Sequence, residues 1–391
     1  EDLRQPALAL TTYRTLARKF SQEPQGEMAA WRSGWVHCQA GRWQEAYDQF
    51  KNNLERIPKG GLADKNLFWM AKSAVILKKE PEAQTLDRDL ADRFPFTYYG
   101  LQARHHLDGA SPAPFEAATP FQKASYKNQK APFTQPGRRL SSRERFHFKH
   151  GVELIELGYF SQARIEFLRM GRSIRKNLSG VMWLGHWYNR ARAYADSMQI
   201  LQLYKDFKTI HGEKELPRGF WINFFPSAYS EFIRAETEKY DLDPWLVEGL
   251  IRQESMYNTQ SLSPAGARGL MQIMPKTGKR LFERTHPDQP FHKDALFEPD
   301  LNIRLGVRYL NDLTRKLKGN GIHILITYNA GPKILKAWLR RFRGLKDMDV
   351  FIESIPYPET RGYVKHVMRN YGIYKNLYPA PMAQAPANKS F

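Results

Sequence analysis

The chain has 391 residues, a formal net charge of +20 at pH 7 and a sequence pI near 9.8. Hydrophobic residues make up 42% of it and aromatic residues 13%, which excludes a mostly disordered chain and allows two or three folded domains. The single cysteine, Cys38, excludes an intramolecular disulfide and a cysteine-based zinc site. The chain contains no run of 18 apolar residues, so no transmembrane helix is predicted.

Residues 1–107 have the apolar spacing and the turn residues of helices joined by short turns, and strand-like alternation is scarce throughout the chain. Two sets of residues share the same spacings: Gly34, Gly41, Ala46 and Phe50, and then Gly151, Gly158, Ala163 and Phe167. Small residues let the two helices of a hairpin approach closely, and aromatic side chains fill the space between hairpins. The pattern therefore resembles tetratricopeptide-like repeats. We predict an all-α fold that begins with a superhelical arm of α-helical hairpins over residues 1–225.

Proline interrupts the helical pattern at several places. Residues 108–140 contain five prolines among small and polar residues, which predicts an irregular connection within the arm. Prolines and a glycine between Leu216 and Pro226 mark the next boundary, so a second domain is expected over 226–378. The Pro/Ala-rich stretch 379–391 is expected to be a flexible tail.

A helix is predicted to begin at Asp243-Pro244, because aspartate suits the N-cap and proline the first helical position. Its apolar stripe consists of Leu246, Val247, Leu250 and Ile251. Glu254 continues this stripe, so its carboxyl is expected against apolar surface, where desolvation raises the pKa. A carboxyl that stays protonated near neutral pH can donate a proton to a leaving oxygen. The alternative is a carboxylate that pairs with an arginine or reaches solvent at the helix end.

The next segment is a glycine-rich loop that ends at a proline. Gly266 and Gly269 permit tight turns and close backbone approach. Gln272 can donate and accept hydrogen bonds, as an amide or hydroxyl of a sugar requires, and Met274 offers a flexible apolar surface. Pro275 should start the following helix.

Two further segments follow a helix predicted over about 300–317. Gly331 is expected to cap a helix C-terminus, and Pro332 to start the next helix. Close to the C-terminus, Glu359 and Arg361 form a charged pair of residues beside two tyrosines, as in many sugar-binding grooves.

Four runs of residues together resemble the signatures of soluble lytic transglycosylases, whose catalytic unit is the SLT domain. They are Glu254-Ser255, Gly-Leu-Met-Gln at 269–272, Tyr-Asn-Ala-Gly at 328–331 and Ile-Pro-Tyr-x-Glu-Thr-Arg-x-Tyr at 355–363. They occur in the family order and at compatible spacing. The resemblance is strong over 226–378 and loose over 1–225, through the superhelical arm that some members carry.

The resemblance implies a lysozyme-like α-helical domain that cleaves the β-1,4 bond between N-acetylmuramic acid and N-acetylglucosamine without water. The product is a 1,6-anhydromuramoyl end, and Glu254 acts first as general acid and then as general base. By resemblance the groove is lined by Ser255, Ser263, Gln272, Met274, Tyr328, Asn329 and Glu359. Tyr328 is the candidate to hydrogen-bond the N-acetyl group or Glu254. Glu359 is either a second carboxyl near the site or the partner of Arg361 in a salt bridge.

The resemblance also implies where the protein acts and with what. Its partner would be peptidoglycan glycan strands in the periplasm, with other cell-wall enzymes as further candidates, and we expect a monomer with no cofactor and no metal. We expect neither nucleic-acid binding nor an integral membrane segment. The chain starts without Met and without a basic-then-apolar leader, which fits a mature product whose signal peptide has been removed.

Three alternatives remain open. The first is a hydrolytic muramidase related to goose-type lysozyme, which would leave reducing muramic acid ends. The second is an inactive scaffold that binds peptidoglycan through a dead domain. The third is a nucleic-acid binder, which rests on the positive charge alone because no binding motif is recognisable.

Overall fold

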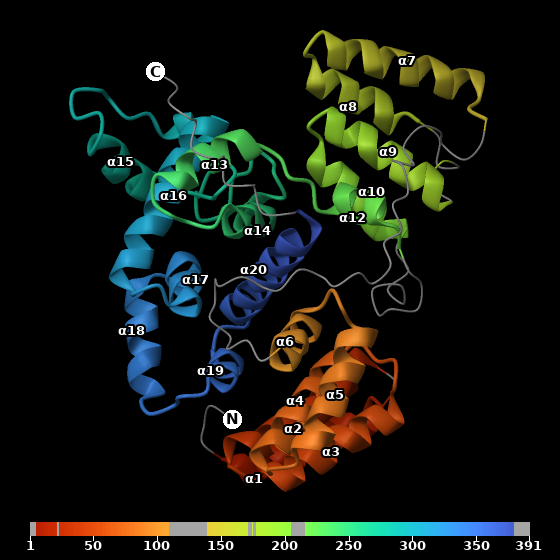
Figure 1. Ribbon diagram of the computed structural model, residues 1–391, viewed down its shortest axis with the longest axis vertical. Coiled ribbons are helices and arrows are strands. Elements are labelled where there is room, and N and C mark those ends of the chain that lie inside the picture. Colours follow the sequence, from red (N-terminus) through yellow and green to blue (C-terminus); the bar gives the residue numbers. More distant parts are fainter. Residues whose placement is uncertain are drawn as a thin grey trace, which may run out of the picture. The chain divides into compact units, whose positions relative to one another are not determined.

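The structure is a computed structural model that describes residues 5–21, 23–108, 139–170, 174, 177–204 and 216–378. Every regular element in these ranges is a helix, and only isolated β-bridges interrupt the loops there (Figure 1). The predicted all-α fold is therefore confirmed for the described residues. Almost all of the predicted connection at 108–140, and the whole tail at 379–391, lie outside them. None of the described helices is both long and apolar enough to cross a membrane.

The chain divides into two compact units. Among described residues, the helices of the first unit are α1 (Pro6–Lys19), α2 (Pro24–Gln39), α3 (Trp43–Arg56), α4 (Ala63–Ile76), α5 (Glu80–Arg93) and α6 (Tyr98–Leu107). Consecutive helices of this unit pack against each other as antiparallel hairpins around a core rich in tryptophan. Trp35 lies at its centre, with its ring centroid 5.9 Å from that of Trp31 and 4.7 Å from that of Trp69.

The second unit contains the remaining described helices. Its first helices are α7 (Ser142–Glu156), α8 (Phe160–Leu168), α9 (Leu178–Arg190), α10 (Tyr194–Tyr204) and α12 (Arg218–Phe224). They are followed by α13 (Ser230–Glu238), α14 (Pro244–Ser255), α15 (Pro275–Glu283), the 3-10 helix η2 (Lys293–Phe297) and α16 (Pro299–Lys316). The last are α17 (Gly321–Ala330), α18 (Pro332–Arg341), α19 (Met348–Ser354) and α20 (Pro358–Leu377).

The spacing repeated in the sequence corresponds to a repeated contact. A methyl group added at Gly34 of α2 would lie 2.4 Å from a ring carbon of Phe50 on α3. One added at Gly151 of α7 would lie at the same 2.4 Å from the ring of Phe167 on α8. In both hairpins only glycine lets the aromatic ring pack directly on the neighbouring backbone, so the predicted close approach is confirmed.

The predicted domain boundary at residue 225 lies inside the second compact unit. Helix α12 covers most of the expected boundary segment and packs against α9 and α10. Arg252 of α14, which is 8% exposed, donates a hydrogen bond to the carbonyl of Phe224, and its guanidinium lies 3.8 Å from the ring centroid of Phe225. Helices before and after residue 225 therefore share one core, and a separately folding domain over 226–378 stays a prediction.

Helices α14 and α20 pack side by side within the second unit, in antiparallel directions, with Tyr363 facing Glu254 and Tyr371 facing Asp243. Their backbones approach closely at Gly249, where an added methyl group would lie 2.9 Å from the backbone nitrogen of Tyr371. The side-chain amide of Asn370 donates a hydrogen bond of 3.2 Å to the carbonyl of Gly249. This close packing fixes the residues of α20 that face the C-terminal turn of α14.

Candidate active site

Glu254 lies in the last turn of α14. The helix begins as predicted, with the Asp243 carboxylate accepting a hydrogen bond of 2.9 Å from the backbone nitrogen of Trp245 and Pro244 in the first position. It ends at Met256, which has a left-handed backbone conformation with φ of 49°. Glu254 is partly exposed, while Ile251 and Leu250 of the same stripe are fully buried. Glu254 thus lies at the edge of the core.

Tyr363 of α20 is the hydrogen-bond partner of Glu254. Its hydroxyl donates to Glu254 Oε1 over 2.6 Å. Burial raises the pKa of Glu254 to about 7, the Tyr363 hydrogen bond opposes this rise, and the negative charge of Glu359 adds to it. The carboxyl can therefore be protonated or ionised near neutral pH, as a general acid and base requires.

Tyr328 lies near Glu254 but its hydroxyl is used elsewhere. It donates a hydrogen bond of 2.8 Å to the carbonyl of Met271. Burial and then the charge of Glu254 raise the pKa of Tyr328 well above its ordinary value. Tyr363, not Tyr328, thus makes the tyrosine contact with Glu254. Tyr363 belongs to the run recognised in the sequence, but its spacing with Val364 and Val367 is that of a core tyrosine.

The Gly-Leu-Met-Gln loop is held against the end of α14. The Ser255 hydroxyl, on a residue only 7% exposed, donates to the carbonyl of Leu270 over 2.8 Å. Gly269 has φ of +75°, and a side chain there would collide with the carbonyl of Leu296 at 2.1 Å. The amide nitrogen of Gln272 donates to the carbonyl of Gly269 over 2.8 Å. Ser255 and the nitrogen of Gln272 therefore shape this loop.

Asn302 of α16 also holds the loop, and the sequence analysis did not select it. Its side-chain oxygen accepts a hydrogen bond of 2.7 Å from the backbone nitrogen of Met271. Its amide nitrogen donates to the carbonyls of Arg268 and Leu296, over 2.9 and 2.7 Å. The side chain is fully buried, so an amide on the apolar face of the predicted helix was the signal that could have found it.

Three other predicted groove residues lie on the loops and helix ends of this region. Ser263 accepts a hydrogen bond of 3.0 Å at its hydroxyl from the backbone nitrogen of Ala267. Met274 is 43% exposed and precedes α15. Asn329, in the last turn of α17, accepts a hydrogen bond of 2.7 Å from the hydroxyl of Thr360. This last bond joins the Tyr-Asn-Ala-Gly run to the first turn of α20.

Glu359 is exposed in the first turn of α20 and forms no ion pair with a described residue. Arg361 instead pairs with the buried carboxylate of Glu353 over 3.8 Å and donates a hydrogen bond of 2.7 Å to the carbonyl of Ile355. The Glu359–Arg361 salt bridge considered from the sequence is therefore wrong. Glu359 acts on Glu254 through its charge.

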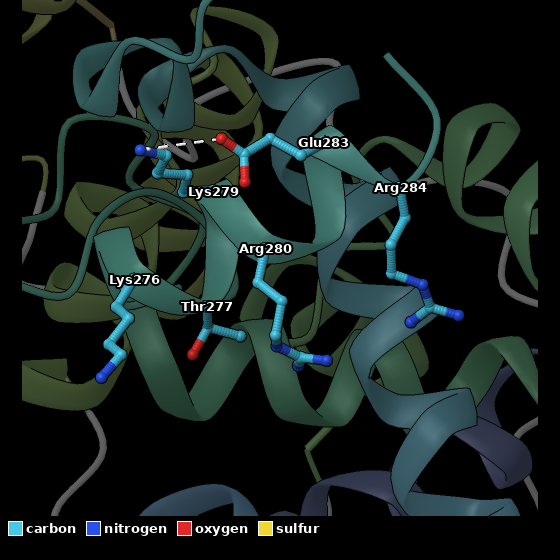
Figure 2. Close-up of a pocket in the computed structure, with 6 residues that line it drawn as sticks. All are labelled: Lys276, Thr277, Lys279, Arg280, Glu283 and Arg284. Carbon is cyan, nitrogen blue, oxygen red and sulfur yellow. Dashed lines mark ion pairs between the residues drawn. The ribbon is translucent and has the colours of Figure 1, made fainter. Parts of the chain in front are cut away.

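A cationic pocket of about 670 Å³ lies along α15 (Figure 2). It is lined by Lys276, Thr277, Lys279, Arg280, Glu283 and Arg284. Lys279 and Glu283 form an ion pair of 3.6 Å within it. None of the predicted groove residues lines this pocket. Within the described ranges, no group of three or more His, Cys, Asp or Glu residues is arranged to hold a metal ion.

Residues 231–351 match the model of the family described as "Transglycosylase SLT domain". This part of the chain is therefore similar to transglycosylase SLT domains. The SLT match contains Glu254 and the loops around it, but it ends before Glu359 and Tyr363. The SLT domain predicted from the four runs of residues is thus confirmed over residues 231–351.

Two relatives of the SLT domain are named soluble lytic murein transglycosylase. The protein of Salmonella typhimurium is 37% identical over 153 residues, which are 39% of this chain and 24% of that protein. The protein of Escherichia coli K12 is 36% identical over 151 residues, 39% of this chain and 23% of that protein. The matches thus span about a quarter of these relatives.

The fold is similar to solved structures over nearly the whole chain. An inactive mutant of the lytic transglycosylase Slt from Pseudomonas aeruginosa matches with a TM-score of 0.66 and 22% identity, over 95% of this chain and 57% of that one. The 70-kDa soluble lytic transglycosylase in complex with bulgecin A matches with a TM-score of 0.64 and 22% identity, over 90% and 52%. Outside the SLT domain, the similarity to these structures is limited to the fold.

Proposed function

We propose that this chain is a peptidoglycan lytic transglycosylase. It cleaves the β-1,4 bond between N-acetylmuramic acid and N-acetylglucosamine and leaves a 1,6-anhydromuramoyl end. The observation that carries the proposal is the state of Glu254: within an SLT domain, burial raises its pKa to about 7 while Tyr363 donates it a hydrogen bond of 2.6 Å. The relatives named murein transglycosylases support the same reaction.

In the first step Glu254 donates its proton to the oxygen of the glycosidic bond. The bond from that oxygen to C1 of the muramic acid breaks, and N-acetylglucosamine leaves with its hydroxyl restored. The N-acetyl group of the muramic acid assists by closing onto C1. Glu254 is now a carboxylate, which the Tyr363 hydrogen bond stabilises.

In the second step the C6 hydroxyl of the same muramic acid attacks C1, and the bond between C1 and the N-acetyl oxygen breaks. Its proton passes to the Glu254 carboxylate, which restores the enzyme, and no water is consumed. An intramolecular hydroxyl has a high effective concentration, so it competes with water. One carboxyl therefore serves both steps, whereas an ordinary glycosidase needs two.

The surroundings of Glu254 suit a sugar. Met274 offers an exposed apolar surface. Gln272 carries an amide group on the loop that Ser255 binds, and Asn329 carries one beside the first turn of α20. The net charge of +20 and the cationic pocket along α15 favour adhesion to an anionic cell wall. We propose the periplasm as its location, with other cell-wall enzymes as candidate partners.

The test is mass spectrometry of the fragments that the purified protein releases from cell-wall sacculi. We expect non-reducible anhydro ends, lighter by one water than the products of hydrolysis. Reducing muramic acid ends would instead establish a muramidase of the goose-type lysozyme class. Sacculi that stay intact while the protein co-sediments with them would establish an inactive scaffold.

A further inference from the structure

Helix α14 carries a second carboxyl with a raised pKa. Glu248 lies six residues before Glu254 and is 1% exposed. Burial raises the pKa of Glu248 to about 8, against the opposing effects of Tyr257, Ser227 and the charge of Arg234. The proposed reaction does not use it, and no predicted site residue touches it. A buried carboxyl is costly compared with an apolar side chain of similar size, so its presence calls for an explanation.

Glu248 is the first member of a buried chain of hydroxyl groups. The Ser227 hydroxyl donates to its Oε1 over 2.7 Å, and the Tyr257 hydroxyl contacts its Oε2. The hydroxyls of Tyr257 and Tyr374 are 2.7 Å apart, and Tyr374 donates to the carbonyl of Pro226 over 3.0 Å. The Tyr257 hydroxyl also lies 3.3 Å from the carbonyl of Glu248. The Glu248 carboxyl is thus joined through Tyr257 to Tyr374 of α20.

The buried chain of hydroxyl groups fixes the residue at which α14 ends. Tyr257 comes directly after the turn that follows Glu254 and Ser255, and both Met256 and Tyr257 have positive φ, 49° and 63°. A left-handed conformation at two successive side-chain-bearing residues is unfavourable unless the surroundings hold it. The buried hydroxyl of Tyr257, which hydrogen-bonds to Glu248 and Tyr374, stabilises this conformation.

The same contacts set the register of α20 against α14. Three hydrogen bonds join the two helices in antiparallel order. They link Tyr371 to Asp243 over 2.8 Å, Asn370 to Gly249 over 3.2 Å, and Tyr363 to Glu254 over 2.6 Å. Tyr374 adds the link to Glu248 through Tyr257. The bond at Glu254 is therefore the last of a series, and its geometry depends on the bonds before it.

We propose that Glu248 is a positioning residue, which acts through Tyr257 and Tyr374 to end α14 behind Glu254 and to hold Tyr363 of α20 against the Glu254 carboxyl. The kinetic part of this inference rests on the proposed function, whereas the structural part does not. The titratable groups that face Glu254 are Tyr363 and Glu359 of α20 and Tyr328 of α17. Those that face Glu248 are Arg234 of α13 and the tyrosines 194, 257, 374 and 378.

The test measures the pKa of Glu254 in the full chain by NMR of ¹³C-labelled glutamate carboxyls, with its signal assigned as the one lost in Glu254→Gln. Tyr363→Phe is the reference, because losing this hydrogen bond removes an effect that lowers the pKa of Glu254. We expect Glu248→Leu and Tyr257→Phe to raise this pKa in the same direction. Glu248→Gln can donate to Tyr257 and accept from Ser227, so it should behave as wild type.

Kinetics on sacculi provide the second readout. For Glu248→Leu and Tyr257→Phe we expect kcat to fall by about tenfold, the equivalent of one hydrogen bond, with KM nearly unchanged. The alkaline limb of the pH profile should move to higher pH, as for Tyr363→Phe. Glu248→Gln should have the kcat and the pH profile of wild type.

Glu144→Ala is the matched control for lost stability, because it removes a buried glutamate and half of the capping box of α7 in the same unit. It should leave the pKa of Glu254 unchanged. Folded Glu248→Leu and Tyr257→Phe with a wild-type pKa at Glu254 would overturn the inference. If wild type cleaves no sacculi, the proposed function fails, while the NMR measurement still decides the role of Glu248.

Discussion

The two carboxyls of α14 differ in access more than in acidity. Burial raises the pKa of both, to about 7 for Glu254 and about 8 for Glu248. Glu254 is partly exposed at the helix end and has one tyrosine partner, while Glu248 is 1% exposed and has two hydroxyl partners. A raised pKa therefore does not by itself identify a catalytic acid. The acid must also be reachable by substrate and free to lose its proton in a turnover.

The largest expected difference between the two carboxyls is in catalysis. Glu254→Gln should lower the rate of fragment release from sacculi by about 10²- to 10⁴-fold, the range typical for loss of a general acid. Glu248→Gln, with its hydrogen bonds kept, should stay within a few-fold of wild type. Binding of both variants to sacculi, measured by co-sedimentation, should persist. A high residual rate in Glu254→Gln would mean that Glu359 shares the acid role.

The stability of the protein should depend on pH through both carboxyls. Each has a folded-state pKa above its ordinary value of 4.5, so the folded state holds the proton more tightly than the unfolded state. Their contribution is fully present below about pH 4.5 and is lost as the pH rises through about 7 for Glu254 and about 8 for Glu248. Each lowers the free energy of unfolding by about 1.4 kcal/mol per pH unit within its window.

Urea unfolding at several pH values separates the two contributions. Glu254→Gln should flatten the dependence up to about pH 7, and Glu248→Gln should flatten it up to about pH 8. An unchanged slope in Glu248→Gln would show that burial does not raise the pKa of Glu248 in the folded protein.

A substitution at Gly249 tests how closely α14 packs against α20, at a position between the two carboxyls along α14. Gly249→Ala places a methyl group 2.9 Å from the backbone nitrogen of Tyr371, so α20 must shift. We expect a loss of about 1 to 3 kcal/mol in the free energy of unfolding, typical of overpacking, and a lower kcat because Tyr363 moves with α20. Wild-type stability and kcat in this variant would show that the packing of α14 against α20 tolerates an added methyl group.

The smallest expected effect is that of Glu359. Its charge raises the pKa of Glu254, so Glu359→Gln should move the alkaline limb of the pH profile to lower pH. Because Glu359 is exposed, the shift should shrink further in high salt. A large fall in rate at all pH values would contradict a purely electrostatic role.

Short-range patterns in the sequence predicted much of the local structure. Asp243-Pro244 starts α14, Pro275 starts α15, and Gly331-Pro332 separates α17 from α18, all as expected. The glycine and phenylalanine spacings of the two hairpins were also predictive, because a close helix crossing needs a small residue at a fixed distance along the chain. The family and Glu254 as its candidate acid followed from runs of a few residues.

Contacts between distant segments were decided by tertiary structure alone. Tyr363 reaches Glu254 across 109 residues, and Tyr374 reaches Tyr257 across 117. The position of Arg252 against Phe224 likewise places residues on both sides of the predicted boundary in one core. Caps and turns depend on neighbouring residues, so the sequence by itself determined them. The partners of buried polar groups depend on how two whole helices are registered, and no local pattern contains that information.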